Sequence, residues 1–122
     1  MEVALLMLLA LLFTKHFVVD FMLQTPYQYL NKGKYGHPGG ILHSWLHAMA
    51  TLFIVGYFDT SMVMLAVLDF VIHYHVDWAK VQINSKFNWK ADTHKEFWWL
   101  LGLDQFLHAL TYLGIAYVLV TF

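Results

Sequence analysis

The composition of this chain is that of a membrane protein: of its 122 residues 60% are hydrophobic and 12% are charged, and the formal net charge is −1. A soluble domain has about 45–50% apolar and about 25% charged residues. The chain has no basic stripe or nucleic-acid motif, which excludes nucleic-acid binding, and no cysteine, which excludes disulfides, thiolate metal sites and cysteine nucleophiles. Its length allows one domain, residues 1–122.

Four transmembrane helices are expected, in chain order at residues 3–23, 41–58, 62–79 and 96–120. Each has about 18–25 residues, which at 1.5 Å per residue is enough to cross a hydrocarbon core of about 30 Å. Asp59-Thr60-Ser61 is a short polar break whose side chains suit helix capping. We expect a short amphipathic linker at residues 80–92, followed by a capping box at residues 93–96. The predicted fold is all-α, an antiparallel up-down bundle of four transmembrane helices.

The distribution of lysines predicts the orientation of this bundle. The 59–61 break and both termini carry no lysine. The first and third loops, with the residues beside them, carry six: Lys32, Lys34, Lys80, Lys86, Lys90 and Lys95. Because positive charge is retained on the cytoplasmic side, both loops should be cytoplasmic and both termini outside.

Each predicted helix carries two ionisable residues four positions apart. The pairs are His16 with Asp20, His43 with His47, His73 with Asp77, and Asp104 with His108. This spacing places both side chains on one helix face, as in motifs whose two residues bind one metal ion. Random placement of the His and Asp residues would give roughly two such pairs. The predicted helices contain five, counting Asp69 with His73.

All eight paired residues fall at a similar depth in the predicted bundle. Counted from Leu23, Ile41, Ala79 and Trp99 at the cytoplasmic side, they lie 2–9 positions into the membrane, or about 3–14 Å below the interface. Buried carboxylates without a cation are costly, so we predict that these eight residues bind metal. Histidine and aspartate without sulfur suit one or two divalent transition-metal ions, zinc, iron or manganese, without choosing among them. Hydrogen bonds that hold helices together and a proton or ion path remain open as alternatives.

Neighbouring polar residues carry weaker expectations. Lys15 should face away from the ligands and extend toward the interface. Asp69 lies one turn from His73 and should support it. Gln105 should orient a ligand or a water molecule, and His75 should point away from the ligand face.

Several motifs together resemble a known family. They are H-x-x-x-D-F-x-x-Q-T at residues 16–25, the His43/His47 pair, H-x-x-x-D-x-x-K at residues 73–80, and L-D-Q-x-x-H at residues 103–108. The combination is similar to the membrane proteins called domain of unknown function 3307. The resemblance covers nearly the whole chain and implies an integral protein of the inner (cytoplasmic) membrane, of bacterial or phage origin. A further similarity to membrane-bound metal-dependent hydrolases implies a hydrolase by analogy only.

The leading functional hypothesis is a membrane-embedded metal-dependent hydrolase. It would act on a lipid or another phosphate or acyl substrate at the cytoplasmic interface, where a metal can lower the pKa of bound water to about 7. No residue is assigned as catalytic. One alternative is a metal-stapled scaffold that binds another membrane protein. The other is an ion or proton transporter, but the predicted helices lack the mid-helix breaks that are typical of transporters. The lipid bilayer is the expected partner, and a homo-oligomer remains open.

Overall fold

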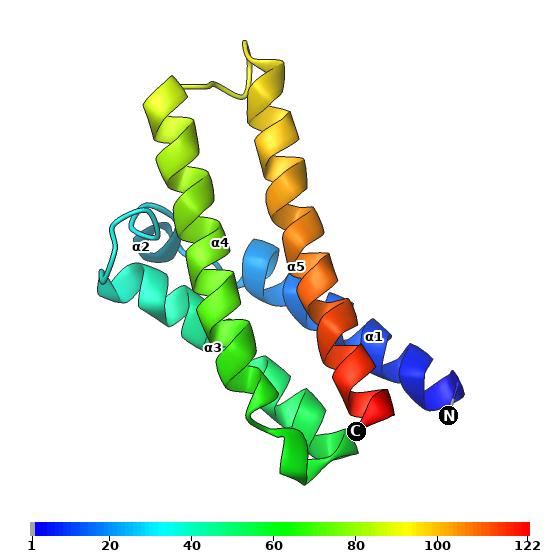
Figure 1. Ribbon diagram of the computed structural model, residues 1–122. Coiled ribbons are helices and arrows are strands. Elements are labelled where there is room, and N and C mark those ends of the chain that lie inside the picture. Colours follow the sequence, from blue (N-terminus) through cyan, green and yellow to red (C-terminus); the bar gives the residue numbers. More distant parts are fainter. Residues whose placement is uncertain (1) are drawn as a thin grey trace.

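The computed structural model describes residues 2–122 as four long helices joined by short turns (Figure 1). The elements are α1 (Glu2–Phe17), the π-helical turn η1 (Val18–Met22), α2 (Pro26–Tyr29), α3 (Pro38–Phe58), the 3₁₀ turn η2 (Thr60–Met62), α4 (Leu65–Phe87) and α5 (Lys95–Thr121). Four segments are long and apolar enough to cross a membrane: Glu2–Met22, Pro38–Phe58, Thr60–Phe87 and Lys95–Thr121. The predicted all-α fold with four membrane helices is confirmed.

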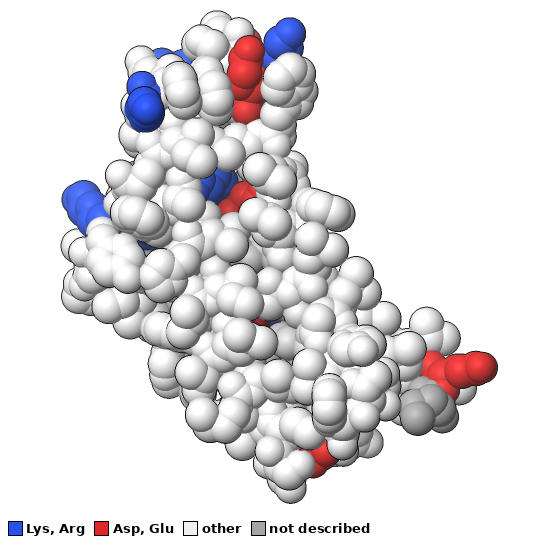
Figure 2. Space-filling model, viewed as in Figure 1, with Lys and Arg blue, Asp and Glu red and all other residues white. Residues whose placement is uncertain are grey.

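The four long helices enclose a single interior. α3 packs against α4, α4 against α5, and α1 against both α3 and α5. In Figure 1 the two termini lie near the end that holds the turn between α3 and α4, and the tip at residues 88–94 lies at the opposite end. Figure 2 shows the blue lysines gathered toward that opposite end. We call it the lysine-rich end of the bundle.

The third membrane helix is longer than the hydropathy pattern predicts. α4 continues to Phe87, so residues 80–87 of the expected linker are helical and only residues 88–94 connect α4 to α5. Residues 80–87 contain no glycine or proline that would end a helix. The helix stops at Asn88, whose φ of 52° is left-handed, a conformation that asparagine tolerates better than most residues. Lys80 and Lys86 therefore lie on a helix and not in a loop.

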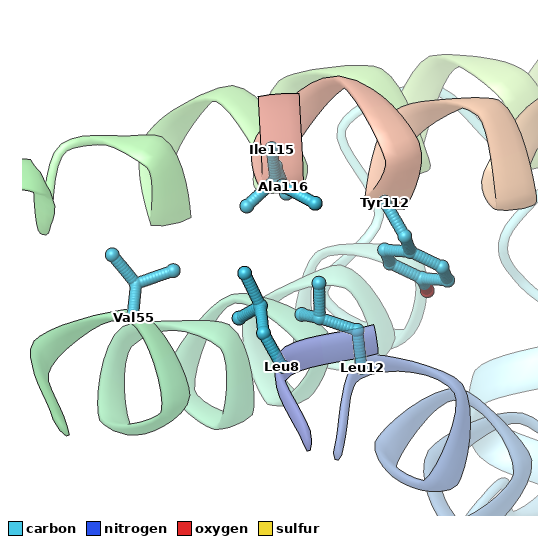
Figure 3. Packing of buried hydrophobic residues seen from close by; sticks show 6 residues of the cluster. All are labelled: Leu8, Leu12, Val55, Tyr112, Ile115 and Ala116. Atoms are coloured by element: carbon cyan, nitrogen blue, oxygen red, sulfur yellow. The ribbon is translucent and has the colours of Figure 1, made fainter. Parts of the chain in front are cut away.

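An apolar core fills the half of the bundle nearer the termini. Figure 3 shows its buried residues, contributed by α1, α3 and α5: Leu8, Leu12, Val55, Tyr112, Ile115 and Ala116. Dispersion contacts between such closely packed side chains can stabilise a helix bundle in a membrane, where the hydrophobic effect between helices is weak. Tyr112 marks the border of this core, because its hydroxyl lies 2.7 Å from the Nδ1 atom of His16. Beyond that border the interior is polar.

Candidate metal centre

All eight predicted ligand residues lie buried in one cluster, in the lysine-rich half of the bundle. Three of the four pairs are in contact within their own helix, as the four-residue spacing predicts. The distances are 3.1 Å from His16 Nε2 to Asp20 Oδ2, 3.2 Å from His73 Nε2 to Asp77 Oδ2, and 3.5 Å from His108 Nε2 to Asp104 Oδ1. The rings of His43 and His47 have centroids 4.9 Å apart. The up-down topology thus brings the four pairs together, and their binding of metal stays a prediction.

A first group, Asp20, His43, His47 and His73, could hold a metal ion. Asp20 Oδ1 lies 3.0 Å from His43 Nε2, 2.8 Å from His47 Nε2 and 3.6 Å from His73 Nε2. The Nε2 atoms of His43 and His73 are 3.3 Å apart. Two atoms each about 2.0–2.2 Å from one tetrahedral ion are separated by about 3.3–3.6 Å. The observed spacings are close to those of ligands that surround a single ion.

A second group, His73, Asp77 and His108, could also hold a metal ion. Asp77 Oδ2 lies 3.2 Å from His73 Nε2 and 3.3 Å from His43 Nε2. Its other oxygen, Oδ1, lies 3.1 Å from His108 Nε2. The two oxygens of Asp77 therefore face different groups. Because one imidazole nitrogen binds one ion, two ions here would share the carboxylate of Asp77 and not His73.

His16 and Asp104 flank the two groups without belonging to either. The Nε2–H of His16 donates to Gln105 Oε1 at 2.7 Å, and its Nδ1 accepts from the Tyr112 hydroxyl at 2.7 Å. Asp104 Oδ2 accepts from Gln105 Nε2 at 3.1 Å and lies 3.7 Å from Lys80 Nζ. Both nitrogens of His16 are thus occupied by protein partners. The expected role of Gln105 in orienting carboxylates matches its contacts, since it also donates to Asp20 Oδ2 at 3.3 Å.

His43 has the surroundings of a metal ligand. Its Nε2 faces the cluster, while its Nδ1–H donates to the buried Gln28 Oε1 at 3.1 Å. Histidines that bind metal commonly hold the second ring nitrogen in a hydrogen bond of this kind, which fixes the tautomer and the orientation of the ring. Gln28 is held in turn by its own bond to the Leu23 carbonyl at 3.3 Å.

His47 has a different arrangement, because Lys15 Nζ donates to its Nδ1 at 2.9 Å. An ammonium group can only donate, so this Nδ1 carries no hydrogen and Nε2 carries it. The Nε2–H then donates to Asp20 Oδ1 at 2.8 Å. In this state His47 holds Asp20 in place and does not offer a free electron pair to a metal.

Lys15 is buried, which corrects the expectation that it faces away from the ligands. Its Nζ forms an ion pair with Asp69 Oδ2 at 3.0 Å, and the Thr51 hydroxyl donates to the same oxygen. Asp69 therefore supports Lys15. The expectation that it supports His73 is wrong. The cause lies in the packing of α1, which contacts both α3 and α5 and so turns two of its faces inward. His75, as expected, is exposed and away from the cluster.

Several supporting residues were missed by sequence reasoning. Thr51 lies one turn beyond His47 and Tyr112 one turn beyond His108, so extending the four-residue stripes would have found both. Gln28 gives no such signal, because it reaches the cluster from α2.

Asp20 is positioned by η1, the π-helical turn that follows α1. Such turns are rare and frequently occur at functional sites. Gln24 donates to the Asp20 carbonyl at 2.7 Å and accepts from Lys32 Nζ at 3.0 Å. Lys32 can lie close to α3 because a glycine faces it: a Cβ at Gly40 would come within 2.9 Å of Lys32 Cα. Lys32 Nζ is thereby placed 3.6 Å from Asp77 Oδ2.

The cluster contains buried polar atoms that the protein leaves without partners. Within residues 2–122, five buried side-chain atoms lack a hydrogen-bond partner, and three of them belong to predicted ligands: His73 Nδ1, Asp77 Oδ2 and Asp104 Oδ1. An unsatisfied buried group costs about 1–3 kcal/mol, and more when it is charged. A divalent cation would compensate the two carboxylates, so the donor set fits a metal.

Residues 8–122 match the family described as "Protein of unknown function (DUF3307)". The chain belongs to this family. The DUF3307 match includes every residue of the polar cluster and reaches all four membrane helices. Neither the curated proteins nor the solved structures give a match. The similarity to membrane-bound metal-dependent hydrolases stays a prediction.

Proposed function

We propose that this chain is a membrane-embedded metal-dependent hydrolase acting on a phosphate or acyl substrate. One observation carries the proposal: imidazole nitrogens and carboxylate oxygens from four helices meet in a buried cluster at separations of 2.8–3.6 Å. Hydrogen bonding between helices needs one such pair and does not account for three buried aspartates beside five histidines.

The ligands divide between two positions. Asp20, His43 and His73 would hold one ion and His108 the other, with Asp77 bridging them. Three protein ligands on the first ion would leave its fourth position to water, as in catalytic sites. With Asp77 as a fourth ligand, water or substrate would bind only if the coordination number expanded to five. Zinc, iron and manganese all suit these donors. The metal would supply the acidity of a bound water and would polarise a phosphoryl or acyl oxygen.

The remaining polar residues have roles that follow from their contacts. His47 and Gln105 fix the orientation of Asp20 through hydrogen bonds to its two oxygens. Asp104 Oδ1, which has no hydrogen-bond donor, is the candidate general base that accepts a proton from the attacking water. Lys80 lies beside the same carboxylate and can stabilise negative charge that develops on the substrate.

The lysine-rich end would face the cytoplasm by the positive-inside rule, so the reaction would take place at the inner leaflet of a bacterial membrane.

One observation favours a second function, a metal-stapled scaffold. The first group offers four buried ligand atoms, enough to fill a tetrahedral site if His47 binds through Nε2. The hydrogen bond from Lys15 to His47 Nδ1 speaks against that closed site.

A turnover assay tests the proposal. Purified, metal-loaded protein is incubated with phosphate and acyl lipids and with soluble phosphate and acyl esters, and products are measured by mass spectrometry. We expect hydrolysis that chelation abolishes and that returned metal restores. Asp104→Asn should lower the rate at least about 100-fold while metal content is kept, because a general base contributes about 10²–10⁴-fold. Asp92→Asn, at the exposed tip, is the matched control. Metal-loaded protein that hydrolyses none of these substrates would contradict the hydrolase.

A further inference from the structure

We infer that two adjoining hollows at the lysine-rich end bind one anionic phospholipid, with its phosphate between Lys32 and Lys80 and one acyl chain between α4 and α5. This names the substrate class for the proposed function and rests on that function for turnover and, through the charge of the bound metal, for the preference for an anionic headgroup. Binding itself depends on the two hollows and is measured separately.

The first hollow is a cavity of about 420 Å³ with a polar wall that includes Gln24, Lys32, Lys80, Asn84 and Ser85. Lys32 Nζ lies 3.6 Å from Asp77 Oδ2 and Lys80 Nζ lies 3.7 Å from Asp104 Oδ2. These separations are too long for hydrogen bonds. Lys32 Nζ donates one hydrogen to Gln24 Oε1 at 3.0 Å, so both ammonium groups have hydrogens left for a ligand. Asn84 Oδ1 is buried without a partner and can accept from a headgroup hydroxyl. The cavity thus has the donors that a phosphate requires.

The net charge of the cluster with its metal also favours an anionic ligand. The buried Lys15–Asp69 pair is neutral, and Asp20, Asp77 and Asp104 carry three negative charges. Lys32 and Lys80 carry two positive charges, and histidines that bind metal are neutral. One divalent ion therefore leaves a single positive charge, and two ions leave three, or two after one bound water loses a proton. Uncompensated charge is costly inside a membrane. A phosphate monoester, which carries about −1.5 to −2, can neutralise it, whereas a zwitterionic headgroup cannot.

The second hollow is a groove of about 410 Å³ that adjoins the cavity, because Lys80 and Leu100 line both. It extends between α4 and α5 to Val71 and Leu107, and apolar side chains line most of it. Val71 and Lys80 are nine positions apart on α4, or about 13.5 Å along the helix axis. Figure 2 shows basic and acidic atoms together in a recess on the visible face. The lining of the groove includes a basic and an acidic residue, Lys80 and Asp104.

The groove decides between a lipid and a free phosphate. Val71 and Leu107 are exposed on the outer surface of the bundle, where the hydrocarbon region holds no water. An acyl chain is the ligand that fills an apolar groove opening into lipid, and a chain lying there would bring its headgroup to Lys80. Inorganic phosphate could use the cavity but would gain nothing from the groove.

Lipid binding is tested on the purified protein by native mass spectrometry from detergent. Phosphatidic acid, phosphatidylcholine and inorganic phosphate are titrated as separate probes. Phosphatidic acid should bind at least tenfold more tightly than either of the others. Lys80→Gln should weaken it at least tenfold, whereas Lys86→Gln, which removes the same charge from an exposed position of α4, should not.

A second pair of variants tests the groove. Leu107→Trp fills it and should weaken phosphatidic acid binding about tenfold, whereas Leu110→Trp, exposed on α5 but outside both hollows, should leave binding unchanged. Equal binding of phosphatidic acid and phosphatidylcholine overturns the inference. So does equal behaviour within either pair of variants, or phosphate that binds as tightly as the lipid. Selective lipid binding without turnover contradicts the hydrolase alone, and turnover of soluble esters without lipid binding contradicts this inference alone.

Discussion

His73→Ala should destabilise the bundle far more than His75→Ala, although the two histidines lie two positions apart on α4. His73 is 0% exposed, its ring stacks on those of His47 and His108 at 3.7 and 3.9 Å, and it belongs to both candidate metal groups. His75 is exposed, with its Nε2 accepting from the Tyr35 hydroxyl at 2.8 Å. The two substitutions remove the same side chain from a buried polar cluster and from the surface.

The size of the difference follows from two contributions. Truncating a large buried ring costs about 3–5 kcal/mol. Losing a metal present at 100 times its Kd removes about 2.7 kcal/mol more. His75→Ala should change the free energy of unfolding by no more than about 0.5–1 kcal/mol, as surface substitutions do. At roughly 3–6 °C per kcal/mol for a chain of this length, the melting temperatures should differ by at least about 15 °C.

Thermal unfolding in detergent, with and without a chelator, measures both contributions. Chelation should lower the Tm of the wild type and of His75→Ala by on the order of 10 °C, the metal-linked part. It should lower the Tm of His73→Ala by less, because that variant has lost a ligand of the first ion. If the two variants melt together, the assignment of His73 to the buried face is wrong. If chelation shifts none of the three proteins, the metal-linked contribution does not exist.

Two other predictions concern the buried ion pair and the topology. Lys15→Met leaves the Asp69 carboxylate buried without its partner at 3.0 Å, so it should lower the free energy of unfolding by about 3–5 kcal/mol. Adding Asp69→Asn should restore most of the lost stability, which is measured as Tm. A double variant no more stable than the single one would contradict the pairing. Cysteines introduced at Asn31 and Asn88 should resist an impermeant thiol reagent in intact cells, because the positive-inside rule predicts that the lysine-rich end faces the cytoplasm. Labelling of either would contradict that orientation.

The four helices could be predicted because a bilayer demands about 20 apolar residues for each crossing, and the chain contains four such runs. The end of α4 could not be placed in the same way. Residues 80–87 are polar enough to look like a linker, but they have no helix breaker and continue as helix to Phe87. Hydropathy reports where lipid ends, which need not be where a helix ends.

The cluster could be predicted because a spacing of four residues selects one helix face and the up-down topology selects one depth. What spacing could not show is how each side chain bonds. Lys15 is one residue from His16, about 100° around the helix, and it reaches the interior because α1 packs between two neighbours. Its hydrogen bond to His47 Nδ1 then decides which nitrogen of that ring carries a hydrogen. Likewise the division of the Asp77 oxygens between two groups depends on contacts between helices.

The metal content of the purified chain tests the central claim most directly. Protein prepared without chelator is analysed for its elements before and after incubation with zinc, iron or manganese. The buried groups around Asp20 and Asp77 predict one or two transition-metal ions per chain. Asp77→Asn should bind fewer, whereas Asp59→Asn should lose none, because Asp59 lies in the turn between α3 and α4, outside both groups. Protein that is isolated without metal and takes up none of the three would contradict the metal centre and everything proposed from it.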